Sequence, residues 1–474
     1  MMAALLGVSA VLSGCAGIEP NSEFERDLEQ TDRTLPSMRA SDQDFIEQDY
    51  LTPTPVAWWT VFSEPGLEAM IEATLVNSID LGVAYTRLDE ALAARRATRA
   101  DLLPSVNLTG DIGVSTIDLQ DGGFSSGPSR SQSAGAGLVM GWQLDIFGEL
   151  RAAHRSARAS LEASEQTVRD TQRVIVGQVA QGYYELASVR ERIRVARESL
   201  DRRELNQDRI NQLLDKGYAT TVDQARSDSQ SYDSRAILLQ LELDEITLLN
   251  QLSLLVGVSM VEIRDLLANN QELADIPKEL MAPSVDSLLT NRPDLRTVER
   301  ELVAAAYDVR SARRAQYPTL GLSAGLDKSP ATIDASSNSL PNLNNWASDI
   351  VANLATPILG RGRILAQINT QSARLERAHL NYENALRVAL QGIDTSLASV
   401  IKNRFILEQR VLSRGAARLA AEQSKDLYEA GEIDYTSVIV AEQTRAFAED
   451  NVILAHRNSL IAYIQYTSAV APTW

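Results

Sequence analysis

The sequence predicts a mainly helical protein that also carries four transmembrane β-strands, built as two tandem copies of one design. Three observations lead to this prediction. Sliding the 474-residue sequence over itself by 214 residues brings identical residues together at widely separated positions. Apolar residues recur every seven positions over long proline-free stretches, and strict apolar–polar alternation marks four shorter segments. The first observation indicates duplication, the second long packed helices and the third extended strands.

Composition narrows the class of function. The chain is 44% apolar, only 5% aromatic and 23% charged, with a net charge of −18. Such an acidic balance speaks against binding of nucleic acid, because a phosphate backbone attracts clustered Lys and Arg. A single Cys excludes an intramolecular disulfide, and the three His are scattered. We therefore expect no metal site, no cofactor and no catalytic residue, and we do not expect an enzyme.

The first segment is predicted to be an export signal with a lipid attachment site. Residues 1–12 are apolar or small and lead into Leu12-Ser13-Gly14-Cys15. Such a stretch is typical of a secretory signal and is shorter than the about 20 residues that a membrane-spanning helix needs. The run resembles a bacterial lipobox, in which the Cys becomes the acylated N-terminus, although no basic residue precedes it; an ordinary signal with an incidental Cys is the alternative. Residues 1–14 are expected to be the lipoprotein signal peptide, and 15–57 an acylated segment and linker.

The repeat sets the expected domain boundaries. At the offset of 214, Asp80-Leu81 aligns with Asp294-Leu295, Pro104 with Pro318, and Gly217 with Gly431. A constant offset over so long a span predicts two tandem structural units. The first repeat is expected over 58–267, a connector over 268–284 and the second repeat over 285–474.

In each copy, a helical stretch leads to a proline and then to two strands. Helices are expected over 65–103 and 285–317, because Pro does not continue a helix interior. Alternation then predicts β-hairpins at 105–145 and 319–356. Apolar residues outward and small or polar residues inward over about ten residues is the pattern of a transmembrane β-strand. A half-buried hairpin on a soluble sheet is the alternative, but four similar strands in an exported chain favour the membrane.

The inward positions of these strands include four carboxylates. They are Asp111, Asp145, Asp327 and Asp349. We expect them on the face of the sheet that lines the lumen, where they either make the lumen negative or are simply hydrated.

Long helices follow each hairpin. Residues 148–214 contain no proline, and at about 1.5 Å per residue they give a rod of roughly 100 Å. Its seam is expected at Leu161, Val168, Ile175, Val179, Leu186, Ile193 and Leu200. Return helices are expected over 222–256 and 435–466, and the outgoing helix of the second copy over 363–430. A wall one helix thick leaves its apolar face unburied, so we infer an oligomer.

Several motifs together resemble one known family, the outer membrane factors: TolC-type channels of drug efflux pumps and type I secretion systems. They are the lipobox, Trp58-Trp59, Asp80-Leu81, Leu102-Leu103-Pro104, Trp142-Gln143-Leu144-Asp145-Ile146-Phe147-Gly148 and Asn291-Arg292-Pro293-Asp294-Leu295. The match looks like the lipoprotein branch that serves RND pumps and covers essentially the whole mature chain. The resemblance implies a homotrimer with four strands per protomer in one 12-stranded barrel in the outer membrane. It also implies a long periplasmic α-helical barrel.

The resemblance implies a passive exit duct for drugs or other small toxic compounds. The sequence has no Gly-rich phosphate loop, so energy is expected from a partner. The implied partners are a periplasmic adaptor protein, an inner-membrane RND-type pump and outer membrane lipid. Two alternatives remain: the exit duct of a type I protein secretion system, and a structural periplasmic coiled-coil lipoprotein.

The helical tips are the expected points of control. Adaptor contacts are expected at Gly217, Tyr218, Gly431, Glu432 and Asp434. The resemblance implies a closed-state latch in which Tyr428 bonds Asp223; a helix-capping Asp and a packing Tyr are the alternative. Many members carry acidic residues where this chain has Ser437 and Val440. A charged gate is therefore in doubt, and Thr436 with Val440 is expected to narrow the pore by bulk.

Overall fold

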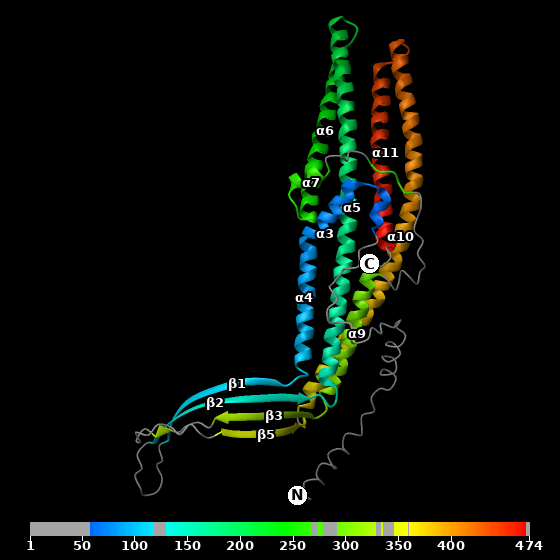
Figure 1. Cartoon of the computed structure of the whole chain (residues 1–474). Helices are drawn as coiled ribbons and strands as arrows, with labels where there is room; N and C mark the ends of the chain where they lie inside the picture. The colour runs from blue at the N-terminus through cyan, green and yellow to red at the C-terminus, as the bar shows by residue number, and fades with distance from the viewer. Residues whose placement is uncertain are drawn as a thin grey trace. The chain divides into compact units, whose positions relative to one another are not determined.

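A computed structural model describes residues 57–117, 129–267, 273–277, 292–328, 333–334, 346–358 and 360–470 (Figure 1). The predicted signal peptide and Cys15 lie outside the described residues, as do most of the expected connector and residues 285–291 of the helix expected from 285. The residues from Pro55 onward form one compact unit.

The described chain is mainly helical, as predicted. In order, its elements are η2 (Trp58–Phe62), α3 (Pro65–Asn77), α4 (Ile79–Ala100), β1 (Ser105–Ile117), β2 (Ser129–Leu144), α5 (Glu149–Asp215), α6 (Thr221–Val256), α7 (Met260–Leu266), α9 (Pro293–Arg314), β3 (Thr319–Lys328), β4 (Ile333–Asp334), β5 (Trp346–Ala355), α10 (Arg361–Glu429) and α11 (Tyr435–Val470). The helix expected over 65–103 is two helices, because the backbone is extended at Ser78 (ψ 124°). No proline or glycine marks that break in the sequence.

The strands form one antiparallel sheet in the order β1-β2-β3-β5, with the short β4 paired to β2. Residues directly opposite each other in such a pair share a face. Leu108 lies opposite Leu138, which in turn lies opposite Leu326, and Leu320 lies opposite Leu354. One face of the sheet is therefore apolar across all four long strands. It is also solvent-exposed in this single chain, since Leu108 is 80% exposed.

The other face combines glycines with carboxylates. Asp111 lies opposite Gly135, Asp327 opposite Gly137, and Asp349 opposite Gly325. A Cβ added at Gly137 would overlap Asp327 Oδ1, and one at Gly325 would lie 2.5 Å from Asp349 Oδ1. The glycines thus leave room for each carboxylate to lie across the neighbouring strand. Three of the four aspartates predicted for this face are on it.

Asp145 is the exception, and its predicted place on the sheet is wrong. β2 ends at Leu144, so the alternation stops one residue earlier. The Asp145 carboxylate instead accepts hydrogen bonds from the backbone N–H groups of Leu150 (3.1 Å) and Arg151 (2.9 Å) and from Arg151 Nε (3.0 Å). Burial raises the pKa of Asp145, but these bonds outweigh burial and hold the pKa below its usual value. Asp145 therefore caps the exposed N–H groups at the start of α5.

The helices pack side by side along α5, which contacts α4, α6, α9 and α11, while α10 contacts α9 and α11. All seven residues predicted for the heptad seam are buried. The main core lies midway along α5, where η2, α3, α6, α7 and α11 meet it; its largest members include Trp58, Phe62, Met70, Tyr184 and Tyr463. The hairpins α5/α6 and α10/α11 both extend away from the sheet (Figure 1).

None of the described helices is by itself long and apolar enough to cross a bilayer. Only α6 and α7 taken together, with a bend of 98° between them, have the necessary length and composition.

Candidate functional site

The two helical hairpins turn at glycines, as the sequence predicts. Gly217 and Gly431 both have φ of 77°, a left-handed conformation that costs glycine little. The N–H of Tyr218 bonds the carbonyl of Leu213 at 2.8 Å, and the N–H of Glu432 bonds that of Leu427 at 2.9 Å. These bonds satisfy carbonyl groups at the ends of α5 and α10. The two tips therefore have the same backbone geometry.

Asp223 lies in the first turn of α6, and Asp434 directly precedes α11. Thr220 and Asp223 form a reciprocal capping box: the Asp223 N–H donates to Thr220 Oγ1 at 3.2 Å, and the Thr220 N–H donates to Asp223 Oδ2 at 3.0 Å. Asp434 accepts bonds from the N–H (3.1 Å) and Oγ (2.6 Å) of Ser437. Hydrogen bonds from Thr220 and Ser437 hold the pKa values of the two carboxyls below their usual range.

Tyr428 packs its ring against Tyr435, with ring centroids 5.6 Å apart. Burial, and then the charges of Tyr435 and Asp223, raise the pKa of the Tyr428 hydroxyl. Within the described tips, Asp223 bonds Thr220 rather than Tyr428. In this geometry Asp223 caps a helix and Tyr428 packs against another ring, as in the alternative to the latch.

Other side chains join the two tips to each other. Arg226 Nη1 on α6 donates to Thr436 Oγ1 on α11 at 2.7 Å. Arg209 on α5 and Glu429 on α10 form an ion pair at 3.3 Å. Asn206 Nδ2 donates to the hydroxyl of Tyr435. None of the three contacts is predicted by the sequence, because the partners lie more than 200 residues apart in the chain and no local pattern links them.

The remaining predicted tip residues are near the same contacts. The Thr436 hydroxyl accepts the hydrogen bond from Arg226, and the Ser437 hydroxyl donates to Asp434. Val440 is 56% exposed on α11, and Tyr218 is 81% exposed. The exposed ring of Tyr218 at the turn is available to a partner. Val440 belongs to none of the hydrophobic clusters of the described residues.

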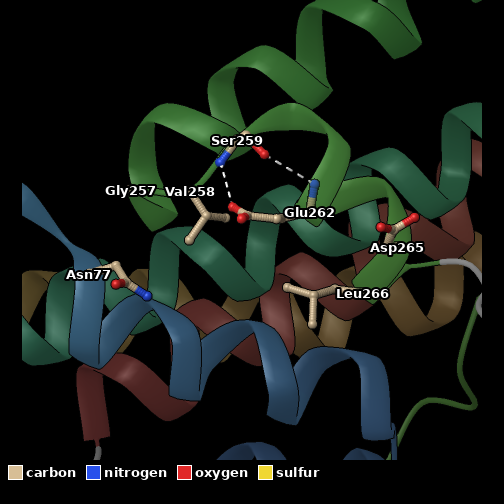
Figure 2. A pocket seen from close by; sticks show the side chains of 7 residues that line it. All are labelled: Asn77, Gly257, Val258, Ser259, Glu262, Asp265 and Leu266. Atoms are coloured by element: carbon tan, nitrogen blue, oxygen red, sulfur yellow. Dashed lines mark hydrogen bonds between the residues drawn. The ribbon is translucent and has the colours of Figure 1, made fainter.

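One pocket lies at the junction of three helices. It has a volume of about 690 Å³, is open to solvent and lies where α3 meets the bend between α6 and α7 (Figure 2). It is lined by Asn77, Gly257, Val258, Ser259, Glu262, Asp265 and Leu266. Ser259 and Glu262 bond each other as the capping box of α7, and Gly257 (φ 83°) leaves no room for a Cβ beside the Asn77 carbonyl. The polar groups of Ser259 and Glu262 therefore serve to cap α7.

No metal centre is apparent where the structure describes the chain. Across the described ranges, no group of three or more His, Cys, Asp or Glu side chains is placed to hold an ion. What the described geometry provides is a pair of matching tips joined by hydrogen bonds, and a sheet with one apolar and one Gly- and Asp-rich face.

The chain is similar to known outer membrane proteins in both sequence and fold. The sequence model of the outer membrane efflux protein family matches residues 70–258 and 284–471. The chain is similar to the pyoverdine export outer membrane protein OpmQ of Pseudomonas aeruginosa, with 30% identity over 88% of this chain and 87% of that protein. It is 26% identical to SilC of Salmonella typhimurium, a probable outer membrane lipoprotein, over 95% and 94% of the two chains. Among solved structures it is similar to the outer-membrane channel OprN, with a TM-score of 0.80, 25% identity and coverage of 93% and 99%.

Proposed function

Because the chain belongs to the outer membrane efflux protein family, we propose that it is the outer membrane channel of a tripartite efflux pump. In this proposal it is a passive duct for drugs or other small toxic compounds, and an adaptor and an inner-membrane RND-type pump engage its tips. The single observation that carries the proposal is the two-faced sheet joined to long helical hairpins. An apolar face suits lipid, and a polar face suits a water-filled lumen.

The proposed assembly is a homotrimer. The sheet of one chain leaves β1 and β5 as edges, and a membrane does not tolerate unpaired strand edges. Pairing β5 of one copy with β1 of the next would give twelve long strands in a closed barrel. Apolar residues that are exposed in the single chain, among them Leu243 and Ile246 on α6 and Phe405 and Leu412 on α10, would be covered between copies.

The two-copy organisation, with repeats over 58–267 and 285–474, remains part of the proposal. It is supported by helix lengths: α5 and α10 have 67 and 69 residues, and α6 and α11 have 36 each. Acylation at Cys15 is also proposed. It is supported by the lipobox and by the similarity to a relative described as an outer membrane lipoprotein. Asp111, Asp327 and Asp349 are proposed to face the lumen.

Deleting the gene tests the function against its runner-up. Loss of an efflux duct should increase susceptibility to toxic small molecules and leave the secreted proteins unchanged. Loss of a type I secretion duct should remove a secreted protein instead. In outer membrane fractions the channel should migrate as a heat-stable trimer that dissociates on boiling. A monomer that stays soluble without detergent once its anchor is removed would contradict both duct functions.

The tips are the proposed gate, closed in part by Arg226 and Thr436. Removing the bond by Arg226→Ala or Thr436→Val should favour the open state by about 0.5–1.5 kcal/mol. That corresponds to roughly a two- to tenfold higher open fraction, measured as conductance in planar bilayers. Thr436→Ser keeps the hydroxyl and Arg410→Ala removes an exposed arginine elsewhere on α10, so both should conduct as the wild type.

The latch implied by family resemblance makes the opposite prediction. If Asp223 and Tyr428 close the channel, Asp223→Ala and Tyr428→Phe should conduct more and Arg226→Ala should not. That outcome would exclude the Arg226 bond as the closing contact and leave the duct function intact.

A further inference from the structure

Arginines gather where the helices join the sheet, in a chain that is otherwise acidic. α4 ends and α5 begins at the strands β1 and β2, and α9 ends and α10 begins at β3 and β5, so these four helix ends lie beside the sheet (Figure 1). Segments 92–103, 145–158, 308–317 and 360–371 hold eleven arginines, four carboxylates and no lysine. The whole chain has 63 acidic against 45 basic side chains, so the sign of the charge is locally reversed.

We call these eleven residues the arginine collar. They are Arg95, Arg96, Arg99, Arg151, Arg155, Arg158, Arg310, Arg313, Arg314, Arg361 and Arg363. Arg151 pairs with Asp145 at 3.0 Å, and Arg158 pairs with Glu162 at 3.1 Å. Arg96, Arg99, Arg310, Arg361 and Arg363 are exposed at the surface of the single chain. The charges of these five arginines are therefore available to an anionic partner.

Three arginines of the collar lie close to His154 at the junction of α4 and α5. The pKa of His154 lies below its usual value, first because the ring is partly buried and then because of the charges of Arg95, Arg99 and Arg158. Arg95 Nε is buried and has no hydrogen-bond partner in the described structure. The site thus combines concentrated positive charge with an unsatisfied donor.

Exposed apolar side chains mark each of the four crossings between helix and strand. They are Leu103 before β1, Ile146 and Phe147 after β2, Tyr317 before β3, and Ile358 after β5, with exposed fractions of 39% to 79%. Phe147 and Tyr317 stack with ring centroids 5.0 Å apart, and the Arg314 guanidinium lies 5.8 Å from the Tyr317 ring centroid. We call these five residues the junction ring.

The order of these layers matches that of a lipid leaflet. The apolar face of the sheet corresponds to the acyl chains, the junction ring to the interface where aromatic side chains are enriched, and the collar to the headgroups. We infer that the arginine collar binds the anionic headgroups of phospholipids in the leaflet from which the helices emerge. A planar guanidinium suits this partner, because it donates two hydrogen bonds to one phosphate and extends on a flexible stem.

The inference rests on the proposed function, since it requires the sheet to be in a membrane. We would reconstitute the full-length protein in vesicles of phosphatidylethanolamine alone or mixed with phosphatidylglycerol, and measure the lipids retained by native mass spectrometry. The wild type should retain phosphatidylglycerol preferentially. The collar variant Arg96→Gln/Arg99→Gln/Arg363→Gln should lose at least about fivefold in this preference, the effect expected for even one arginine at an anionic surface. The matched variant Arg202→Gln/Arg410→Gln/Arg414→Gln removes three exposed arginines from the parts of α5 and α10 far from the sheet. This variant should retain the preference.

The outcomes separate the inference from the function. If the protein enters vesicles of neither composition, the membrane channel itself is wrong. If it inserts but retains both lipids equally, or if both variants lose the preference alike, the collar does not bind anionic headgroups. If the collar variant fails to insert, the salt dependence of the wild type's lipid preference tests the inference instead. Its preference must fall between 0.1 M and 1 M salt, where the screening length shortens from about 10 Å to about 3 Å, and a preference unchanged by salt would contradict the inference.

Discussion

Replacing Asp294 with Asn should destabilise the protein by about 3 kcal/mol. This is the lower end of the range for breaking a buried ion pair, because the Asp294 side chain remains 31% exposed. Asp294 accepts a hydrogen bond from Arg292 at 2.6 Å and lies 3.9 Å from Arg173. The side chains of Arg292 and Arg173 are only 11% and 14% exposed. The substitution removes the carboxylate that pairs with Arg292, whereas Arg173 keeps its ion pair with Asp170 at 2.6 Å.

The two arginines in turn hold the end of α11. Arg173 donates to the carbonyl of Ser468 at 3.0 Å, and Arg292 donates to that of Ala469 at 2.9 Å. The last carbonyl groups of a helix have no partner within the helix, and cations at this end are favourable for the helix dipole. The Arg292-Pro293-Asp294 motif, noticed in the sequence as a family resemblance, therefore joins the start of α9 to α5 and to the end of α11.

The effect should depend on pH in one direction. Burial raises the pKa of Asp294, but the hydrogen bond and charges of Arg292 and the charge of Arg173 outweigh it, so the folded pKa is depressed. A group with a depressed pKa contributes stability above its unfolded value of about 3.9 and loses it as the pH falls through the folded value. The difference in unfolding free energy between wild type and Asp294→Asn should be constant from about pH 7 to pH 5 and shrink below about pH 4.

The proposed repeat offers a control. Asp80 aligns with Asp294 at the offset of 214 residues and lies at the exposed start of α4. Asp80→Asn should cost no more than about 0.3–1 kcal/mol, the usual effect of a charge near a helix terminus. Circular dichroism melting of the detergent-solubilised protein measures both variants. Equal losses at the two positions would show that Asp294 acts only on its own helix.

The sequence predicts periodic features well, because burial imposes them along one element at a time. The heptad seam from Leu161 to Leu200 and the apolar alternation of the strands follow from that local rule, and both appear in the structure. Gly217 and Gly431 predict the positions of the two turns, because glycine adopts the left-handed conformation at little cost.

What the sequence does not reveal depends on contacts between distant segments or on where an element ends. Asp145 continues the apolar–polar alternation of β2 in the sequence. In the structure β2 ends at Leu144, and Asp145 instead caps the start of α5. Arg226 looks like any exposed helix residue until α11 brings Thr436 beside it. Asp223 fits both a latch and a cap, and only the position of Thr220 distinguishes them.

Replacing Phe62 with Ala should destabilise the protein by about 3–5 kcal/mol, the usual cost of truncating a buried aromatic side chain. Phe62 is 7% exposed, and its ring centroid lies 5.3 Å from that of Tyr184 and 5.6 Å from that of Tyr463. One ring therefore joins η2 to α5 and α11, and the two ring pairs contribute beyond their buried area. Hydrogen exchange should rise first in η2 and α3, because these short elements depend on this core and not on the long helical seams. Val61→Ala, at a neighbouring position that is 48% exposed, should change the melting temperature little. A similar loss in both variants would mean that η2 is held by its backbone and that the Phe62 ring is dispensable.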